Sequence, residues 1–598
     1  MSVRNREVPK TGSTELHPDY VLVFDGPTKA VASHVSKALV VLSDSGFYVS
    51  VRPGGGDSML ILVRLEARLI ASADQRTQIV LDSLPWGKLA GLTDSFPIGN
   101  ELPTFLTSEP SLLGNSKAVE SIAKYDWKTA AVFQLRWLMA VNLGGIALLG
   151  IVNWLTGNDF SLVYNLATLF SGTLTVAKWK SLLGTVSTAS VAEEPVRPEY
   201  KGTDKETREL RRLLFIPLAA LLLTVFTLGQ FAVLVIEIFL TQFYDGPLLA
   251  IAKLAPAGAG VVAAIIFGLI NTKVVDAYTE WEDYPTLSQL RAVKQQRSFY
   301  LDLLLAFLPV LLTAYIYLPF GNLLIGVLPY FRSSKFGQYV PLVSAFHLDT
   351  GRLVSQASFY MLQQPIIAMG TTIALPEALM YAKRSIFGQI SAKNNNVFAR
   401  EQMQPPFDAD AELKLLVFAF GYVLVLSSVW PIGSVLLLLV TIVRGRVLLY
   451  SLSRRLRRPQ PDATREATMG SLQQWCANLK FVLVAASIVA PTITVMYGST
   501  NPAKTHSLNA DYLYDYAISA MQVPWVIILA TALLSENAVL IVFTVASKFF
   551  TANESKKLGV QDDAAVSEKA TAAVAEDGVW KQIDVAKELE ALVGSKIQ

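Results

Sequence analysis

The sequence has few residues that could form a disulfide or bind a transition metal. It contains one cysteine, Cys476, and four scattered histidines in 598 residues. A disulfide needs two cysteines, and a zinc site needs several Cys or His ligands at close spacing. A disulfide within the chain and a Cys/His zinc cluster are therefore excluded.

Charged residues are also scarce. They make up 17% of the chain, whereas soluble domains carry roughly 25%. Hydrophobic residues make up 52%, and the mean hydropathy is +0.41. This composition predicts an α-helical polytopic membrane protein, whose partners are membrane lipids. The net charge of +3 says little by itself, and no nucleic-acid partner is expected.

Ten apolar stretches after residue 130 are long enough, or nearly so, to cross about 30 Å of hydrocarbon. They lie near 131–156, 160–178, 213–240, 248–271, 299–325, 353–381, 414–431, 432–450, 478–498 and 517–549. No signal peptide opens the chain, so we expect a cytosolic N-terminus. The cation-rich loops 179–212, 382–413 and 451–477 then also face the cytosol, in agreement with the positive-inside rule.

Three regions follow from this pattern. Residues 1–125 hold a cytosolic α/β domain and a linker, because 20–85 has the strand and helix periodicities of a ferredoxin-like βαββα unit. Residues 126–550 form a ten-helix transmembrane domain. Residues 551–598 form a cytosolic tail that is helical or disordered, and its alternating acids and bases favour a solvated amphipathic helix.

Several segments resemble the anoctamin (transmembrane-sixteen) family, and the resemblance is closest to fungal members. They are "IEIFLTQFYDGPLL", "TEWEDYPT", "FLPVLLTAYIYLPFG" and "FAFGYVLVLSSVWPIGS", in the family's order and spacing. The resemblance implies a homodimer of ten-helix subunits, a cytosolic ferredoxin-like domain and a lipid-facing groove between helices three to seven. Members of this family are calcium-activated phospholipid scramblases, chloride channels or membrane tethers.

The resemblance also gives the positions of the family's calcium ligands, which are acids on helices six, seven and eight. In this sequence those positions are Thr372, Glu412, Leu415, Arg444 and Leu448. Four of the five acids are missing, and one carboxylate cannot supply the six to eight oxygens that calcium takes. We therefore expect no calcium binding and no other cofactor.

The groove implied by the resemblance has one polar wall. Its candidate residues on helices three, five and six are Gln242, Asp302, Thr313, Arg352, Ser355, Phe359, Tyr360 and Gln363. Helix four, "AGAGVVAAIIFGLIN", is apolar before Asn271 and is read as a packing helix. The family's outer latch pairs an acid on helix three with Arg352, but the acid position here is Gln242, so half of the latch is expected to be neutral. Asp302 is either a functional group at membrane depth or a residue near the wet cytosolic interface.

Arg444 lies inside the apolar run "LLLLVTIVRGRVLLY", where an arginine costs roughly 2.5 to 3.5 kcal/mol. Arg446 can reach the cytosolic interface by snorkelling, and Arg444 could do the same. The resemblance favours another interpretation, in which the Arg444 guanidinium takes the place of the metal, within about 4 Å of Glu412. Removing Arg444 alone would then leave a buried, unpaired carboxylate, at a cost of about 3 to 5 kcal/mol.

These observations predict a calcium-independent homodimer with weak or constitutive phospholipid scrambling. One alternative is a tether between endoplasmic reticulum and plasma membrane, as in one fungal member. Another is a chloride channel, supported only by Arg352, Arg444 and Arg446. No nucleophile–base pair can be placed, so no enzyme is expected. The cortical endoplasmic reticulum is the expected location.

Overall fold

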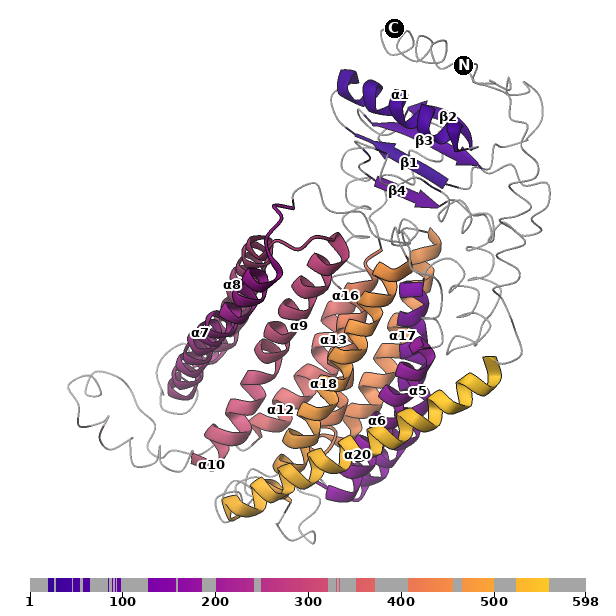
Figure 1. The fold of residues 1–598 in the computed structure, drawn as a ribbon. Helices are drawn as coiled ribbons and strands as arrows, with labels where there is room; N and C mark the ends of the chain where they lie inside the picture. The colour runs from indigo at the N-terminus through magenta and orange to yellow at the C-terminus, as the bar shows by residue number, and fades with distance from the viewer. Residues whose placement is uncertain are drawn as a thin grey trace, which may run out of the picture.

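A computed structural model of the chain contains a small sheet and a bundle of long helices (Figure 1). The description covers residues 20–25, 28–45, 47–53, 58–64, 84, 89, 92, 94–97, 127–157, 160–184, 200–240, 249–320, 330, 333, 351–370, 407–454, 465–498 and 523–558. Several sequence predictions fall outside these residues, among them Gln242, Thr372 and most of the tail after 551.

The sheet is antiparallel, with strand order β2-β3-β1-β4. Its elements are β1 (Tyr20–Phe24), α1 (Thr28–Asp44), β2 (Tyr48–Pro53), β3 (Met59–Arg64) and β4 (Asp94–Pro97). The central strands "YVLVF" and "MLILVR" are rich in β-branched and large apolar residues, which favour strands, and their apolar side chains are buried. The described strand–helix–strand–strand order is the one expected. The second helix of the unit lies outside the described residues, so the complete ferredoxin-like domain stays a prediction.

The described part of the bundle is built from long helices, several of which are interrupted by short turns. They are α5 (Trp127–Leu155), α6 (Leu162–Gly184), α7 (Lys205–Ile238), α8 (Leu249–Glu282), α9 (Leu287–Leu312) with η3 (Thr313–Tyr317) and α10 (Leu318–Phe320), α12 (Arg352–Ser358), η4 (Phe359–Gln363), α13 (Gln364–Met369), α16 (Ala409–Leu426), α17 (Pro431–Arg454), α18 (Arg465–Tyr497) and α20 (Trp525–Leu558). The segments η3 and η4 are π-helical turns inside otherwise continuous helices. Such turns are rare and are found frequently at functional sites.

Six helices in the described part of the chain are long and apolar enough to cross a membrane. They are α5, α7, α9 with its continuation to Phe320, α17, α18 and α20. The protein is therefore an integral membrane protein. The other four expected spans fall on α6, α8, α12 to α13, and α16. They are helical, but ten membrane crossings stay a prediction.

Helix α16 is central in the bundle and packs against α5, α6, α17 and α18. Most of its apolar residues belong to one large buried core. Helices α7 and α8 pack with α9 at one side of the bundle, and α20 crosses the outside of α6 and α18 (Figure 1). Polar side chains at the first turn of α16 are therefore enclosed by neighbouring helices.

Candidate functional site

Glu412 is held in the first turn of α16. The N-cap residue of this helix is Asp408, whose Oδ1 accepts a hydrogen bond from the backbone N–H of Ala411 at 3.0 Å, the usual interaction at this position. The Glu412 side chain faces α5 and α17, and the residue is only 9% exposed. A buried carboxylate must be paired or hydrogen-bonded, so its partners decide what this position can do.

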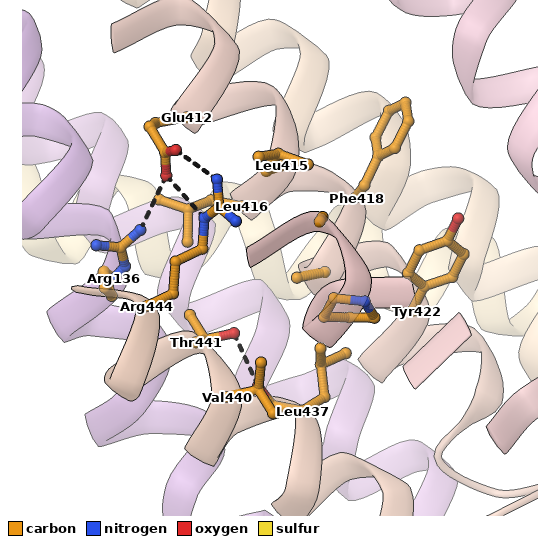
Figure 2. A pocket seen from close by; sticks show the side chains of 13 residues that line it. Arg136, Glu412, Leu415, Leu416, Phe418, Tyr422, Leu437, Val440, Thr441 and Arg444 are labelled. Atoms are coloured by element: carbon orange, nitrogen blue, oxygen red, sulfur yellow. Dashed lines mark hydrogen bonds and ion pairs between the residues drawn. The ribbon is translucent and has the colours of Figure 1, made fainter. Parts of the chain in front are cut away.

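Arg444 on α17 is the first partner of Glu412. Its Nη2 donates to Oε1 at 2.6 Å, and its Nε donates to Oε2 at 3.2 Å (Figure 2). A two-point contact of this kind is the strong form of an arginine–carboxylate pair. The contact predicted from the sequence is confirmed, and Arg444 is buried rather than extended toward solvent.

Arg136 on α5 is a second partner, which the sequence analysis missed. Its Nη2 donates to Oε2 of Glu412 at 3.3 Å, and the residue is 5% exposed. Figure 2 shows the Glu412 carboxylate between the two guanidinium groups. The expectation that removing Arg444 would leave Glu412 unpaired is therefore wrong, because Arg136 remains in contact with it. A signal was present, since Arg136 is the one charged residue between Lys128 and Asp159.

Gly445 provides the space that Arg136 occupies. A Cβ atom on Gly445 would lie 2.8 Å from Cδ and 2.9 Å from Nη1 of Arg136. Both distances are too short for non-bonded heavy atoms of this kind, which make favourable contact at about 3.5 to 4.0 Å. Arg444 therefore supplies one cation, and the neighbouring Gly445 leaves the space that the second cation, Arg136, occupies.

The remaining positions of the family's calcium site add no acid. Leu415 is 37% exposed and Leu448 is buried in the core, while Thr372 lies outside the described residues. Among the described residues, no three Asp, Glu, His or Cys side chains are grouped so that they could hold a metal. A single carboxylate already bound by two cations does not fit calcium, which takes six to eight oxygen ligands.

A cavity of about 70 Å³ adjoins this cluster, between α13, α16 and α17. Its walls are mainly apolar and include Pro365, Ala368, Leu415, Leu437 and Val440. Arg136, Glu412, Arg444 and Thr441 are the strongly polar residues that line it (Figure 2). The ion-pair cluster is thus one wall of a space large enough for a small ligand or water.

Arg352, at the start of α12, forms the outer contact between helices three and six. Its Nη1 and Nη2 donate to the two carboxylate oxygens of Glu237 on α7 at 2.5 and 2.8 Å. Its Nε donates to Thr313 Oγ1 at 3.2 Å. The expectation of a half-neutral latch is wrong, because Glu237 supplies the carboxylate five residues before Gln242. Gln242 itself lies outside the described residues.

Three of the proposed groove residues share one exposed face of the sixth helix. Ser355, Phe359 and Gln363 are spaced four residues apart and are all exposed. Tyr360 is half-buried, and its ring stacks on Tyr422 with centroids 5.3 Å apart. The next exposed residues in the described part of this helix are Ile366 and Ile367, so the described polar face gives way to an apolar one after Gln363.

The groove candidates on α9 and on its continuation η3 are engaged in helix packing. Thr313 is fully buried and donates to the carbonyl of Pro309. Asp302 pairs with Lys414 of α16 at 2.5 Å and accepts hydrogen bonds from Ser298 and Asn271. Asp302 therefore connects α9 to α16 and α8, and its charge is already balanced.

The segment "TEWEDYPT" contributes residues to a buried polar cluster that connects α7, α8 and α9. Glu282 is fully buried and accepts hydrogen bonds from Arg297 Nη2 at 2.6 Å and from the Tyr284 hydroxyl at 2.8 Å. Burial, together with the hydrogen bond to Glu282, raises the pKa of Tyr284 to about 12. The Arg297 guanidinium lies over the Phe215 ring at 4.1 Å, a cation–π contact. This motif therefore fixes three helices to one another.

Asp283 ties the chain before α7 to this cluster. Its carboxylate accepts hydrogen bonds from the backbone N–H groups of Lys201 and Thr203 at 3.0 to 3.2 Å and from the Thr203 hydroxyl at 2.8 Å. Burial alone would raise its pKa, but these hydrogen bonds outweigh burial and hold the pKa below its ordinary value.

Comparisons with known proteins found one family model and two fungal relatives. The family model described as "Anoctamin: Calcium-activated chloride channel" matches residues 132–561. Increased sodium tolerance protein 2 of Saccharomyces cerevisiae is 24% identical over 411 residues, which cover 61% of this chain and 43% of that relative. An uncharacterized protein of Schizosaccharomyces pombe is 20% identical over 578 residues, which cover 82% of this chain and 85% of that relative. The match thus spans less than half the length of the budding-yeast relative.

Proposed function

Because the chain belongs to the anoctamin family, we propose that it is a homodimeric membrane protein that works without calcium and scrambles phospholipids weakly. The observation that carries this proposal is that the Glu412 carboxylate is already paired with arginines. Both of its carboxylate oxygens accept hydrogen bonds from arginines. In this proposal the Arg444 guanidinium acts as a built-in cation that holds α16 and α17 together, so no calcium is needed.

Weak lipid transport is supported by the uneven polarity of the groove helices. A headgroup that crosses a bilayer needs polar partners along its path, because each uncompensated polar group in hydrocarbon costs several kcal/mol. The exposed face of the sixth helix is polar at Ser355 and Gln363 but apolar at Ile366 and Ile367. On α8, Ile266, Leu269 and Ile270 are exposed and apolar. A headgroup therefore meets a polar path over only part of the bilayer.

The decisive experiment is a fluorescent-lipid flipping assay in reconstituted liposomes, with calcium present or chelated. We expect slow flipping at the same rate in both conditions. Calcium-binding calorimetry on the same preparation, with Glu412→Gln as the matched variant, separates loss of binding from loss of transport. A micromolar calcium response that Glu412→Gln removes would contradict calcium independence.

The location in the endoplasmic reticulum is part of the same proposal and rests on the resemblance to fungal members. Fluorescence microscopy of the tagged protein tests it, and a uniform plasma-membrane signal would contradict it. A tethering role predicts in addition that the protein gathers where the two membranes meet. Deletion of residues 559–598 would abolish this gathering if the tail forms the tether.

A further inference from the structure

The charges of the Glu412 cluster do not balance. Among the described residues, two arginines, Arg136 and Arg444, face one carboxylate, so this part of the structure carries one excess positive charge. All three residues are at least 91% buried. Other charged residues of α16 near this turn are engaged elsewhere, since Lys414 pairs with Asp302 and Asp410 pairs with Lys128. An uncompensated charge at such a position costs several kcal/mol, so the cluster favours a counter-ion.

The cluster also has hydrogen-bond donors that no protein group uses. Nε and Nη1 of Arg136 are buried and have no hydrogen-bond partner in the structure. Arg444 uses Nε and Nη2 on Glu412, and its remaining nitrogen points toward the cavity in Figure 2. Buried donors without partners are unusual and call for an unseen ligand or water.

We propose that the cavity beside Arg444 binds a small monovalent anion such as chloride. One excess charge matches one monovalent anion, and the volume of about 70 Å³ has room for an ion of this size. Apart from the three charged residues, the walls are mainly apolar. They therefore cannot replace the water shell of a strongly hydrated ion, and they favour chloride or bromide over fluoride. The anion completes the cluster of Glu412, Arg444 and Arg136 as its fourth charge.

This inference goes beyond the proposed function, because it concerns an anion at a position where relatives are expected to hold a cation. It does not depend on whether lipids are scrambled. Its test needs only the purified full-length protein in detergent, so failure of the lipid assay leaves it untouched.

The experiment is a thermal unfolding series at a constant ionic strength of about 0.15 M, in which sodium gluconate is replaced stepwise by sodium chloride. We expect the melting temperature to rise by roughly 1 to 3 °C for each tenfold increase in chloride once the site begins to fill. Bromide should act at least as strongly, and fluoride should not act. Equal melting temperatures in chloride and gluconate would overturn the proposal.

Charge variants test whether the effect arises at this cavity. Arg136→Gln leaves a neutral Glu412–Arg444 pair, so the chloride effect should disappear. Glu412→Gln leaves two arginines without a carboxylate, so the variant should be less stable in gluconate and gain more from chloride than the parent. Lys548→Gln, which removes an exposed cation on α20, is the control and should keep the parental response. A chloride effect that Arg136→Gln retains would place the anion elsewhere and refute this site.

Discussion

At the residue scale, the three charges of the cluster are not equivalent. Arg444→Ala leaves Glu412 with Arg136, so we expect a loss of only about 1 to 3 kcal/mol in the free energy of unfolding. Glu412→Ala leaves two buried guanidinium groups without a carboxylate and should cost about 3 to 5 kcal/mol. Denaturant unfolding in detergent measures both values. A loss for Arg444→Ala that equals or exceeds the loss for Glu412→Ala would mean that Arg136 does not support the carboxylate.

Asp283 gives a prediction for acid pH. Its pKa is lowered in the folded state, so its hydrogen bonds to Lys201 and Thr203 stabilise the protein fully above the ordinary value of 3.8. This stabilisation is lost as the pH falls below that value. Melting temperatures measured between about pH 3 and 6 test this. The melting temperature of the parent should fall toward about pH 3. Asp283→Asn should melt at a lower temperature than the parent at about pH 6, and its melting temperature should fall less as the pH is lowered. An equal fall in melting temperature for the parent and for Asp283→Asn would contradict this role of the Asp283 carboxylate.

How much of the site could be predicted from the sequence differed from residue to residue. The Glu412–Arg444 contact could be predicted because family spacing put both residues at positions that meet. Arg136 and Glu237 were missed, although each is the lone charged residue of its apolar segment. Isolated ionisable residues inside a span usually have a partner. However, the sequence does not tell which helices are neighbours, so the partner could not be named.

At the scale of helices, apolar length predicted the positions of the six described helices that can cross a membrane, because a span needs about 20 apolar residues. The π-helical turns at Thr313–Tyr317 and Phe359–Gln363 could not be predicted. They depend on packing between neighbouring helices rather than on composition. The turn at Phe359–Gln363 also shifts which residues share the exposed face of Ser355 and Gln363.

The apolar face of α8 leads to a test of lipid transport. Ile266 is 50% exposed, and Ile266→Ser would add a polar partner for a passing headgroup. We expect faster lipid flipping in the liposome assay if the apolar wall limits transport. Leu148→Ser on α5, at a similarly exposed apolar position, is the control and should leave the rate unchanged. An increase in both variants would point to general loosening of the bundle.

At the scale of the whole molecule, α20 presents an unusually apolar outer face. Trp525, Leu533 and Leu534 are all more than half exposed, on a helix that covers α6 and α18 from outside. We expect native mass measurement in detergent to give about twice the chain mass of 65.3 kDa. Leu534→Arg should shift the protein toward monomer. Leu228→Arg is the control, because it also places an arginine at an exposed apolar position, but on α7. This variant should remain a dimer. A parent that is fully monomeric would refute the homodimer.

The N-terminal sheet illustrates another limit of sequence reasoning. Alternating and continuous apolar patterns placed its first three strands and α1, because strand and helix periodicities differ. The short strand Asp94–Pro97 was not predicted, because "DSFP" has little apolar pattern of its own. This segment is a strand because it pairs with β1, not because its own residues favour a strand.

The close fit between Gly445 and Arg136 has a consequence for how this protein could have evolved. A methyl group at position 445 would force the Arg136 side chain out of the space that it fills, so the two positions are expected to change together. An ancestor that had an acid at 444 and a small or apolar residue at 136 would have needed glycine at 445 before the arginine could enter. We therefore expect covariation across relatives, with arginine at the equivalent of 136 only where 445 is glycine.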